Sequence, residues 1–331
     1  MILVTGGTGL VGSHLLYFLT QQNKPIRAIY RFENSLDQVK KVFSYYTDNV
    51  TDTFSKILWY KGDITEVPAM MTYFESITQV YHCAALISFD PKDYREMRKV
   101  NIHGTAILVN LSIAAGVKKF CYVSSIAAIG EHPKEGLTDE SIEWGGNEKN
   151  HGYAITKYGG EMEVWRASQE GVDVVIVNPG VILGSGFWNT GSGKIFSNIA
   201  NGFPFYTNGT TGFVGVKDVV RSMLFLMKST VKNERFILVS ENKSFRDILF
   251  KIADELGKKR PSTLVKPWKS QLFWCWEWLF SKLSARRIQM SKYSAKSLHA
   301  SSYYSSEKIQ RAIDFQFQKI EEVIEEVSRN Y

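Results

Sequence analysis

The stretch from residue 5 to residue 12, Thr5-Gly6-Gly7-Thr8-Gly9-Leu10-Val11-Gly12, determines the fold that this chain is expected to adopt. It stands between an apolar, strand-like run at residues 2–5 and a helical pattern at residues 11–21. Three of its glycines, Gly6, Gly9 and Gly12, are spaced three apart. A backbone without Cβ can turn tightly at Gly6 and approach a ligand at Gly9, and Gly12 lets the helix pack close to the strand.

Such a loop predicts a phosphate site, because the start of the following helix presents free N–H groups and the positive end of its dipole. The alternative is a glycine-rich turn with only a structural role, and the flanking strand and helix argue against it. The residues expected to contact a dinucleotide in this loop are Gly6, Thr8, Gly9, Leu10, Val11 and Gly12.

The first 180 residues alternate strand-like and helical patterns. This alternation predicts an α/β fold with a doubly wound parallel sheet. Helices on both faces of the sheet would explain why the strands are almost continuously apolar. Strands are expected at residues 2–5, 26–30, 57–60, 79–82, 120–124 and 172–178, and helices at 11–21, 36–46, 67–74, 95–115 and 153–170.

The composition of the chain changes after Pro179. Residues 184–193 contain four glycines and predict a loop at the carboxyl end of a strand, where ligands bind in open α/β sheets. A helix at 218–227 and a strand at 236–240 are expected to return to the main sheet. We therefore expect a nucleotide-binding domain of residues 1–180 and roughly 213–240, with a smaller, mostly helical cap of roughly 181–212 and 241–331.

Length, charge and cysteine content exclude several classes of protein. The chain has 331 residues, 44% of them hydrophobic and 22% charged, which is neither a disordered nor a fibrous composition. Its net charge of +7 is too small and scattered to predict nucleic-acid binding. Cys83, Cys121 and Cys275 lack metal-ligand spacing, so no metal is expected, and they fit a reducing compartment. Without a signal-peptide pattern, a cytoplasmic location is expected.

Residues 272–283 are rich in aromatic side chains but include Glu277 and Lys282, and the segment is too short to span a bilayer. Three roles are open for it. It can be a helix buried in the cap or in a dimer contact, part of an apolar substrate pocket, or a peripheral contact with a membrane surface.

Two Tyr-x-x-x-Lys patterns occur, Tyr153 with Lys157 and Tyr304 with Lys308. A chain with 16 tyrosines is expected to contain such a pattern by chance, so context must separate the two. Tyr153 begins a helix, and the i, i+4 spacing places it on one helix face with Lys157. It also follows Ser125, at the end of the fifth strand, by 28 residues. The second pattern lies beyond the sheet and is interpreted as the start of a surface helix.

This combination of residue types suits hydride transfer between a nicotinamide and a carbonyl carbon. The carbonyl oxygen needs a proton, and a lysine ammonium can lower the tyrosine pKa from its free value of about 10. A serine hydroxyl can donate to the same oxygen and orient it. The sequence therefore predicts Tyr153 as acid/base, Lys157 as its tuner and the anchor of the nicotinamide ribose, and Ser125 as the orienting group.

The glycine loop, the run FCYVSSIAAIG at residues 120–130 and the Tyr153 pattern resemble the extended short-chain dehydrogenase/reductase family, which includes NAD-dependent epimerases and dehydratases. The resemblance covers residues 1–240 and implies a Rossmann fold with a nicotinamide cofactor. Counted back from Gly130, it also implies that Ser125, and not the adjacent Ser124, is the catalytic serine. It also implies a homodimer that pairs the helices of residues 101–115 and 153–170.

Several further roles follow from the resemblance and from strand positions. Asp63 and Ile64 would hold the adenine, although Asp63 could instead cap the next helix. Asn101 would support the active site, or stabilise a helix kink. His82 has no partner at ligand spacing and is interpreted as a packed strand histidine. The remaining positions expected beside the dinucleotide are Ala84, Ala85, Asn101, Tyr153, Pro179 and Val181.

The end of the second strand indicates which cofactor is preferred. NAD-selective sites commonly place an acidic residue there to bind the ribose 2′-hydroxyl. This chain has Tyr30 and Arg31 instead, and an arginine can pair with a 2′-phosphate. NADP(H) is therefore favoured over NAD(H). The alternative is a solvated arginine, with Glu33 binding the ribose.

Three features favour the branch of the family that resembles dihydroflavonol reductase and 3β-hydroxysteroid dehydrogenase. Ile126 and Ala127 follow Ser125, where dehydratases carry an acidic pair. No arginine precedes Asp218 to clamp a substrate pyrophosphate. Arg31 also resembles the reductases. We expect NADPH-dependent reduction of a ketone or aldehyde, or the reverse oxidation of an alcohol. The alternatives are a nucleotide-sugar epimerase with tightly bound NAD, and a non-catalytic NADP-sensing regulator.

Overall fold

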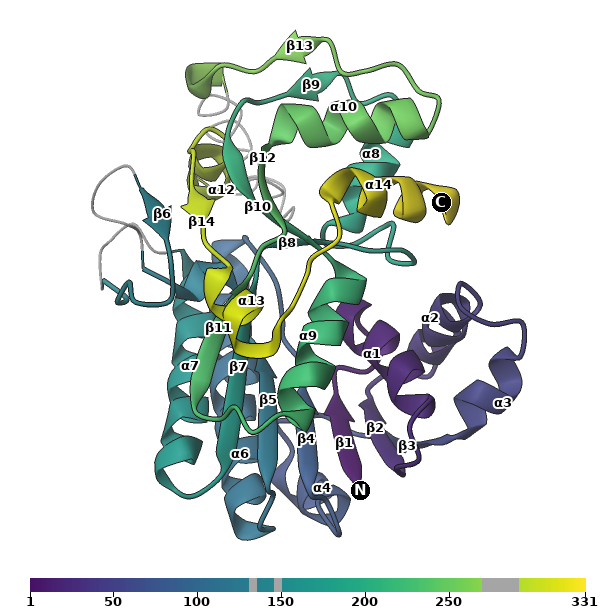
Figure 1. The fold of residues 1–331 in the computed structure, drawn as a ribbon, viewed down its shortest axis with the longest axis vertical. Coiled ribbons are helices and arrows are strands. Elements are labelled where there is room, and N and C mark those ends of the chain that lie inside the picture. The colour runs from purple at the N-terminus through teal and green to yellow at the C-terminus, as the bar shows by residue number, and fades with distance from the viewer. Residues whose placement is uncertain (131–135, 146–150, 270–291) are drawn as a thin grey trace.

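The computed structural model describes residues 1–130, 136–145, 151–269 and 292–331. Within these ranges a seven-stranded parallel sheet has the order β11-β7-β5-β4-β1-β2-β3 (Figure 1). The predicted doubly wound α/β fold is confirmed. The strand order reverses between β1 and β4, which is where ligands bind in such sheets. The strands are β1 (Ile2–Thr5), β2 (Ile26–Tyr30), β3 (Ile57–Lys61), β4 (Gln79–His82), β5 (Lys119–Val123), β7 (Asp173–Pro179) and β11 (Glu234–Leu238).

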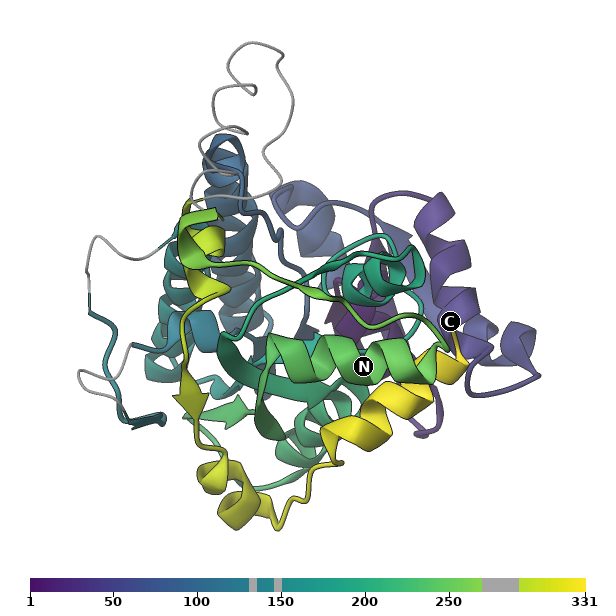
Figure 2. The ribbon, with the colours of Figure 1, turned by 90° about the horizontal axis from the view of Figure 1, so that it is seen from above.

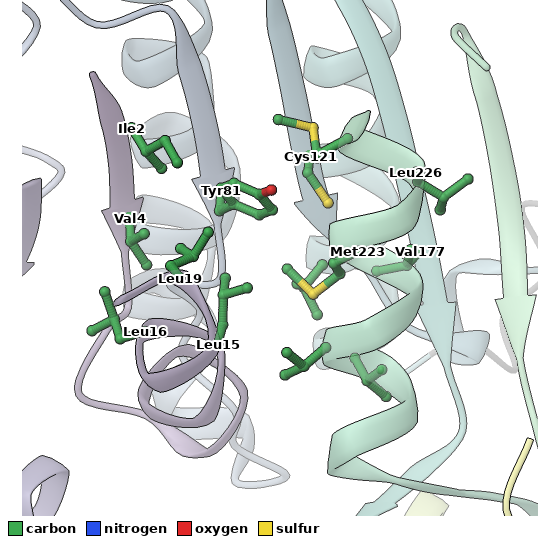
Figure 3. Close-up of a cluster of buried hydrophobic side chains, with 14 of the residues drawn as sticks. Ile2, Val4, Leu15, Leu16, Leu19, Tyr81, Cys121, Val177, Met223 and Leu226 are labelled. Atoms are coloured by element: carbon green, nitrogen blue, oxygen red, sulfur yellow. The ribbon is translucent and has the colours of Figure 1, made fainter. Parts of the chain in front are cut away.

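Helices cover both faces of this sheet, because successive side chains of a strand point to opposite faces. On β7, Val175 and Val177 pack in one apolar cluster, which includes side chains of α1 and α9 (Figure 3). Val174 and Ile176 pack in a second cluster on the opposite face, with α4, α6 and α7. The helices of the first face are α1 (Leu10–Thr20), α2 (Asn34–Phe43), α3 (Val50–Ser55) and α9 (Val216–Lys228), and those of the second are α4 (Val67–Tyr73), α6 (Thr105–Ala114) and α7 (Gly152–Gln169).

The helix predicted over residues 95–115 is not a single α-helix. It begins as α5 (Tyr94–Arg98), continues as a π-helical turn over Lys99–Gly104, and becomes α6 only at Thr105. Asn101 lies inside this turn and is buried. A π-helical turn inside a helix is uncommon and is often found at functional sites.

A second layer lies at the carboxyl ends of the main strands (Figures 1 and 2). Its centre is a small sheet of β8 (Val181–Leu183), β10 (Thr210–Gly215) and β12 (Glu241–Ser244), in which β10 pairs parallel with β8 and antiparallel with β12. Three helices pack against it in one apolar cluster: α8 (Gly193–Ala200), α10 (Phe245–Glu255) and α14 (Ile320–Arg329). Because β8 follows β7 after Gly180, this layer is joined directly to the end of a central strand.

Short elements complete the described ranges. They are β6 (Leu137–Thr138) paired with β14 (Tyr303–Tyr304), β9 (Phe205–Tyr206) paired with β13 (Thr263–Leu264), α12 (Lys292–Ser297), α13 (Glu307–Ile313) and two 3₁₀ turns at Pro91–Asp93 and Ile126–Ala128. The described helices include none that is long and apolar enough to cross a membrane. The aromatic segment 272–283 and Cys275 lie outside the described residues.

Candidate functional site

The glycine loop forms a compact turn between β1 and α1. Gly6 has a φ of +67°, which favours glycine. A Cβ on Gly6 would lie 2.4 Å from the amide nitrogen of Ala84, so the loop packs directly on the segment after β4. A Cβ on Gly12 would lie 2.1 Å from the carbonyl oxygen of Gly6, so only glycine allows α1 to start this close to the turn.

The start of α1 is suited to an anion. Gly9 occupies the N-cap position and offers no side chain to bind the N–H groups of the first turn, which begins at Leu10 and Val11. That turn contains no acidic residue. The free N–H groups and the helix dipole together favour a phosphate beside the loop.

The ends of β2 and β3 bring Arg31 and Asp63 together, with 3.7 Å between the guanidinium and the carboxylate. The Arg31 side chain is 51% exposed. Asp63 also accepts hydrogen bonds from the amide nitrogen of Thr65 (2.9 Å) and from its hydroxyl (2.8 Å). Partial burial opposes these contacts, but together they lower the pKa of Asp63. Asp63 therefore stabilises the turn after β3, and Ile64 beside it is buried.

His82 lies at the end of β4 but has a structural environment. Its ring nitrogens are bonded to the hydroxyls of Thr5 (2.7 Å) and Thr105 (2.9 Å). Burial lowers its pKa to about 3, so the ring is neutral at physiological pH. Among the described residues, no group of His, Cys, Asp and Glu is arranged to hold a metal ion.

The three residues predicted for catalysis come together where β5 meets α7. Ser125 follows β5, and its Oγ accepts from the Ala127 amide (3.1 Å) and bonds the Tyr153 hydroxyl. Lys157 is only 2% exposed, and its Nζ donates to the carbonyl of Val123 (2.6 Å). Burial lowers the pKa of Lys157 to about 7, against the attraction of Glu161.

Tyr153 has a hydroxyl that is protonated at neutral pH. Burial raises its pKa to about 12, although the hydrogen bond with Ser125 opposes the change. The phenol is therefore ready to donate a proton, and anything that places positive charge beside it would bring its pKa down.

Two aromatic rings that the sequence did not predict lie beside Tyr153. The ring of His151 is parallel to that of Tyr153, with 6.0 Å between centroids and 7° between planes. Phe89 lies 6.0 Å from Tyr153 and 5.6 Å from His151. Phe89 is 47% exposed and Ile87 is 58% exposed. Both follow the carboxyl end of β4, which is the signal that could have identified them.

Asn101 joins the segment after β4 to α7. Its Oδ1 accepts from the amide of Leu86 (2.7 Å), and its Nδ2 donates to the carbonyl of Leu86 (2.9 Å) and to the hydroxyl of Thr156 (3.0 Å). Its polar atoms are thus committed to the protein. Asn101 holds the Leu86 end of the segment that also contains Ala84 and Ala85, and both alanines are partly exposed.

The end of β7 is tightly packed. A Cβ on Gly180 would lie 2.3 Å from the carbonyl oxygen of Gly212, so Pro179 and Val181 flank a glycine pressed against β10. Val181 is half-buried.

The second Tyr-x-x-x-Lys pattern does not share one helix face as Tyr153 and Lys157 do, because Tyr304 belongs to β14 and Lys308 pairs with Glu234 on β11.

Comparison with known proteins identifies a matching family and individual relatives. The model of the NAD dependent epimerase/dehydratase family matches residues 2–238. A putative dihydroflavonol 4-reductase of Synechocystis sp. is 28% identical over 290 residues, covering 85% of this chain and 79% of the relative. Sterol demethylase protein B of Methylococcus capsulatus is 28% identical over 270 residues, covering 80% and 77%.

Solved structures share the fold. The UDP-glucose 4-epimerase of Thermotoga maritima, solved with UDP-glucose, superimposes with a TM-score of 0.77 and covers 99% of this chain and 97% of its own. Its sequence is only 20% identical, so this likeness concerns the architecture alone.

Proposed function

Because the chain belongs to the NAD dependent epimerase/dehydratase family, we propose that it is an NADPH-dependent reductase of a ketone or aldehyde. The observation that carries the proposal is the arrangement of Ser125, Tyr153 and Lys157 at one end of β5 and α7. Ile126 and Ala127, not an acidic pair, follow Ser125, which argues against a dehydratase.

The residues at the sheet edge fit a dinucleotide. The turn at Gly6 and Gly12 has no room for a Cβ, and the first turn of α1 offers its N–H groups to the diphosphate. Lys157 would hold the nicotinamide ribose. The other residues that would contact the cofactor are Thr8, Gly9, Leu10, Val11, Asp63, Ile64, Ala84, Ala85, Pro179 and Val181, and Asn101 would support them through Leu86.

NADPH is proposed over NADH because of Arg31. Its guanidinium is half exposed and its contact with Asp63 is long, at 3.7 Å. Exposed ion pairs of this kind contribute little to stability, so the arginine can turn to a 2′-phosphate at small cost. A bidentate contact between guanidinium and phosphate is among the stronger charged hydrogen bonds in proteins.

In the proposed reaction, Tyr153 donates its proton to the carbonyl oxygen as that oxygen gains negative charge. The bound cofactor supplies the hydride that reduces the carbonyl carbon. The Ser125 hydroxyl donates to the same oxygen and orients it. After proton loss, the Lys157 ammonium stabilises the Tyr153 phenolate, and a proton from solvent restores the phenol.

The substrate is proposed to be a small to medium-sized carbonyl compound without strong negative charge, lying between the sheet edge and the layer of β8, β10 and β12. Phe89 supports this, because it offers exposed apolar surface beside the ring of Tyr153, and Ile87, two residues before it, is also exposed. The homodimer expected through the helices at residues 101–115 and 153–170 stays a prediction.

Replacement of Tyr153 by phenylalanine tests the proposal. Without its proton donor, Tyr153→Phe should reduce kcat by about 100-fold or more, since general acid catalysis contributes about 10²–10⁴-fold. The dissociation constant for NADPH should change by less than about twofold, because the ring remains in place. The measurement is NADPH oxidation with a panel of aromatic and aliphatic aldehydes and ketones, together with a fluorescence titration of NADPH.

The matched control is Tyr304→Phe, the same change in the second Tyr-x-x-x-Lys pattern, which should leave kcat unchanged. Full turnover by Tyr153→Phe would refute the proposed role. If the wild-type protein purifies with tightly bound NAD and interconverts nucleotide sugars, its function is that of an epimerase and not of a reductase.

A further inference from the structure

A buried acidic residue continues the face of α7 that carries Tyr153 and Lys157. Glu161 follows Lys157 by one helical turn, and its side chain is completely buried. Residues at i, i+4 and i+8 share one face of a helix. The carboxylate therefore lies on the same side of α7 as the two residues proposed for catalysis.

The Glu161 carboxylate binds three side chains from three strand ends. Its Oε2 accepts from the hydroxyl of Ser124 (2.7 Å) and from Nδ2 of Asn178 (2.9 Å). Its Oε1 accepts from Nη1 of Arg235 (3.2 Å), a residue of β11 that lies 74 positions away in the sequence. The network thus links α7 to the carboxyl ends of β5 and β7 and to the start of β11.

Arg235 is held in place by main-chain oxygens. Its Nη2 donates to the carbonyls of Glu140 (2.8 Å) and Ile142 (3.1 Å), and its side chain is only 14% exposed. Replacing such a pair with apolar side chains is often neutral or stabilising, so fold stability alone does not explain its presence. The groups that contact the Glu161–Arg235 pair therefore indicate what else the pair does.

Two contacts lead from this network to the proposed catalytic residues. Asn178 Nδ2 donates to the carbonyl oxygen of Ser125 (3.0 Å) as well as to Glu161, and Ser124 precedes Ser125 in the chain. The carboxylate also attracts the Lys157 ammonium one turn earlier on α7, which opposes the lowering of the Lys157 pKa by burial. One carboxylate is thus linked to both residues that are proposed to act with Tyr153.

We propose that Glu161, held by Arg235, is a positioning residue that fixes the end of β5 bearing Ser125 and balances the charge of Lys157. This inference rests on the proposed function, because it assigns Glu161 a role in that same reaction. Glu161 acts through Ser125 and Lys157 and does not touch the reacting atoms.

Other groups that face Lys157 are neutral at pH 7. They are Tyr153 on α7, Tyr122 on β5, and His82 and Cys83 at the end of β4. Burial raises the pKa of the Cys83 thiol to about 12 and lowers that of His82 to about 3. Within the described part of the chain, Glu161 is therefore the group that keeps the Lys157 ammonium charged against burial.

Glu161→Gln tests the inference through the pH profile. Loss of the carboxylate should lower the pKa of Lys157 below its value of about 7. If activity needs the Lys157 ammonium, the variant should then become inactive at a lower pH than the wild type. We expect the high-pH limb of kcat to move down by about one pH unit, and kcat at its optimum to fall about tenfold. The matched control is Glu163→Gln, a partly exposed glutamate of α7 that pairs with Arg166, which should leave both quantities unchanged.

Two more variants separate positioning from a purely structural role. Glu161→Asp keeps the charge and should restore the pH profile. The double variant Glu161→Gln, Arg235→Gln removes the guanidinium that Glu161→Gln leaves buried without its carboxylate, so it should recover stability lost in Glu161→Gln but keep the shifted profile of Lys157. Chemical denaturation checks folding, and the double variant supplies the profile where the single variant does not fold. Reduced activity with an unmoved profile, or a profile restored by the double variant, would overturn the inference.

A binding experiment separates this inference from the proposed reaction. The dissociation constant of NADPH or NADH, measured against pH by fluorescence, reports Lys157 without turnover. If wild-type protein loses affinity for the cofactor at high pH and Glu161→Gln loses it at a lower pH, the result would support the network. This holds even where the wild-type protein reduces no carbonyl compound. Active wild-type protein with the same pH limb as Glu161→Gln would support the reductase and overturn the inference.

Discussion

Individual residues at the carboxyl edge of the sheet have defined and separate tasks. Gly6 and Gly12 leave no room for a Cβ, so they fix the path of the phosphate loop. His82 has both ring nitrogens bonded to threonine hydroxyls and is structural. Arg31 differs from them, because its guanidinium is half exposed and only loosely paired with Asp63. It is therefore available to a ligand.

Arg31→Ser should separate the two nicotinamide cofactors. A charge-assisted hydrogen bond contributes about 1.5–3 kcal/mol, so the dissociation constant for NADPH should rise at least about tenfold. That for NADH should change by less than about threefold, because it has no 2′-phosphate. The measurement is fluorescence titration of both cofactors. Lys56→Ser, an equal loss of charge at the opposite end of β3, is the control. Equal effects of Arg31→Ser on both cofactors would refute NADPH selectivity.

At the scale of elements, the π-helical turn between α5 and α6 is held by contacts outside its own helix. Asn101 binds both main-chain polar groups of Leu86 and the hydroxyl of Thr156, which precedes Lys157. The turn therefore fixes the distance between the segment after β4 and α7. The cofactor and the proposed catalytic residues would lie on these two segments.

Asn101→Ala should disturb both stability and catalysis. Leu86 would lose partners for its N–H and its carbonyl, and an unsatisfied buried group costs about 1–3 kcal/mol. We expect the free energy of unfolding to fall by about 2–3 kcal/mol, with a lower kcat. Urea denaturation and steady-state kinetics measure the two effects. The control is Asn110→Ala, an exposed residue of α6 with one side-chain contact, to Arg166. Equal destabilisation by the two changes would contradict the assigned role of the turn.

At the scale of the whole molecule, a loop of the second layer is tied to the main sheet's helices. His14 of α1 contacts the Ser185 carbonyl through Nε2 (3.1 Å) and the Tyr46 hydroxyl through Nδ1. Asn330, after α14, donates to the hydroxyl of Ser185 (3.1 Å), and Gln38 of α2 contacts the carbonyl of Gly186. The contacts hold the layer of β8, β10 and β12 over the start of α1.

His14 makes the stability of the fold depend on pH. Burial lowers the pKa of His14 from 6.5 to about 4. Between these two pH values the unfolded chain therefore binds a proton at His14 and the folded chain does not. Stability should therefore fall as pH drops from 6.5 toward 4, by about 2 kcal/mol between pH 7 and pH 5 from His14 alone. His82 acts in the same direction.

Urea denaturation at the two pH values measures this effect. His14→Gln should show a smaller loss of stability between them than the wild type, by about the same 2 kcal/mol. His103→Gln, a change at an exposed histidine, should leave the difference as it is in the wild type. An identical pH dependence in His14→Gln and the wild type would refute the assignment.

Features that depend on neighbours along the chain could be predicted from the amino-acid sequence. The spacing of Gly6, Gly9 and Gly12 predicts the turn before α1, and apolar runs predicted β1, β2 and β4 with their observed bounds. The i, i+4 spacing placed Tyr153 and Lys157 on one face of α7. These predictions succeed because backbone freedom and side-chain periodicity act over a few residues.

Features whose partners are distant in the sequence became clear only from the folded structure. The π-helical turn depends on Leu86 and Thr156, and β10 belongs to a second sheet because β8 and β12 are its partners. Phe89 stands beside Tyr153, and Arg235 pairs with Glu161 across 74 positions. No local pattern encodes these contacts, because packing of distant segments determines which side chains meet in the folded chain.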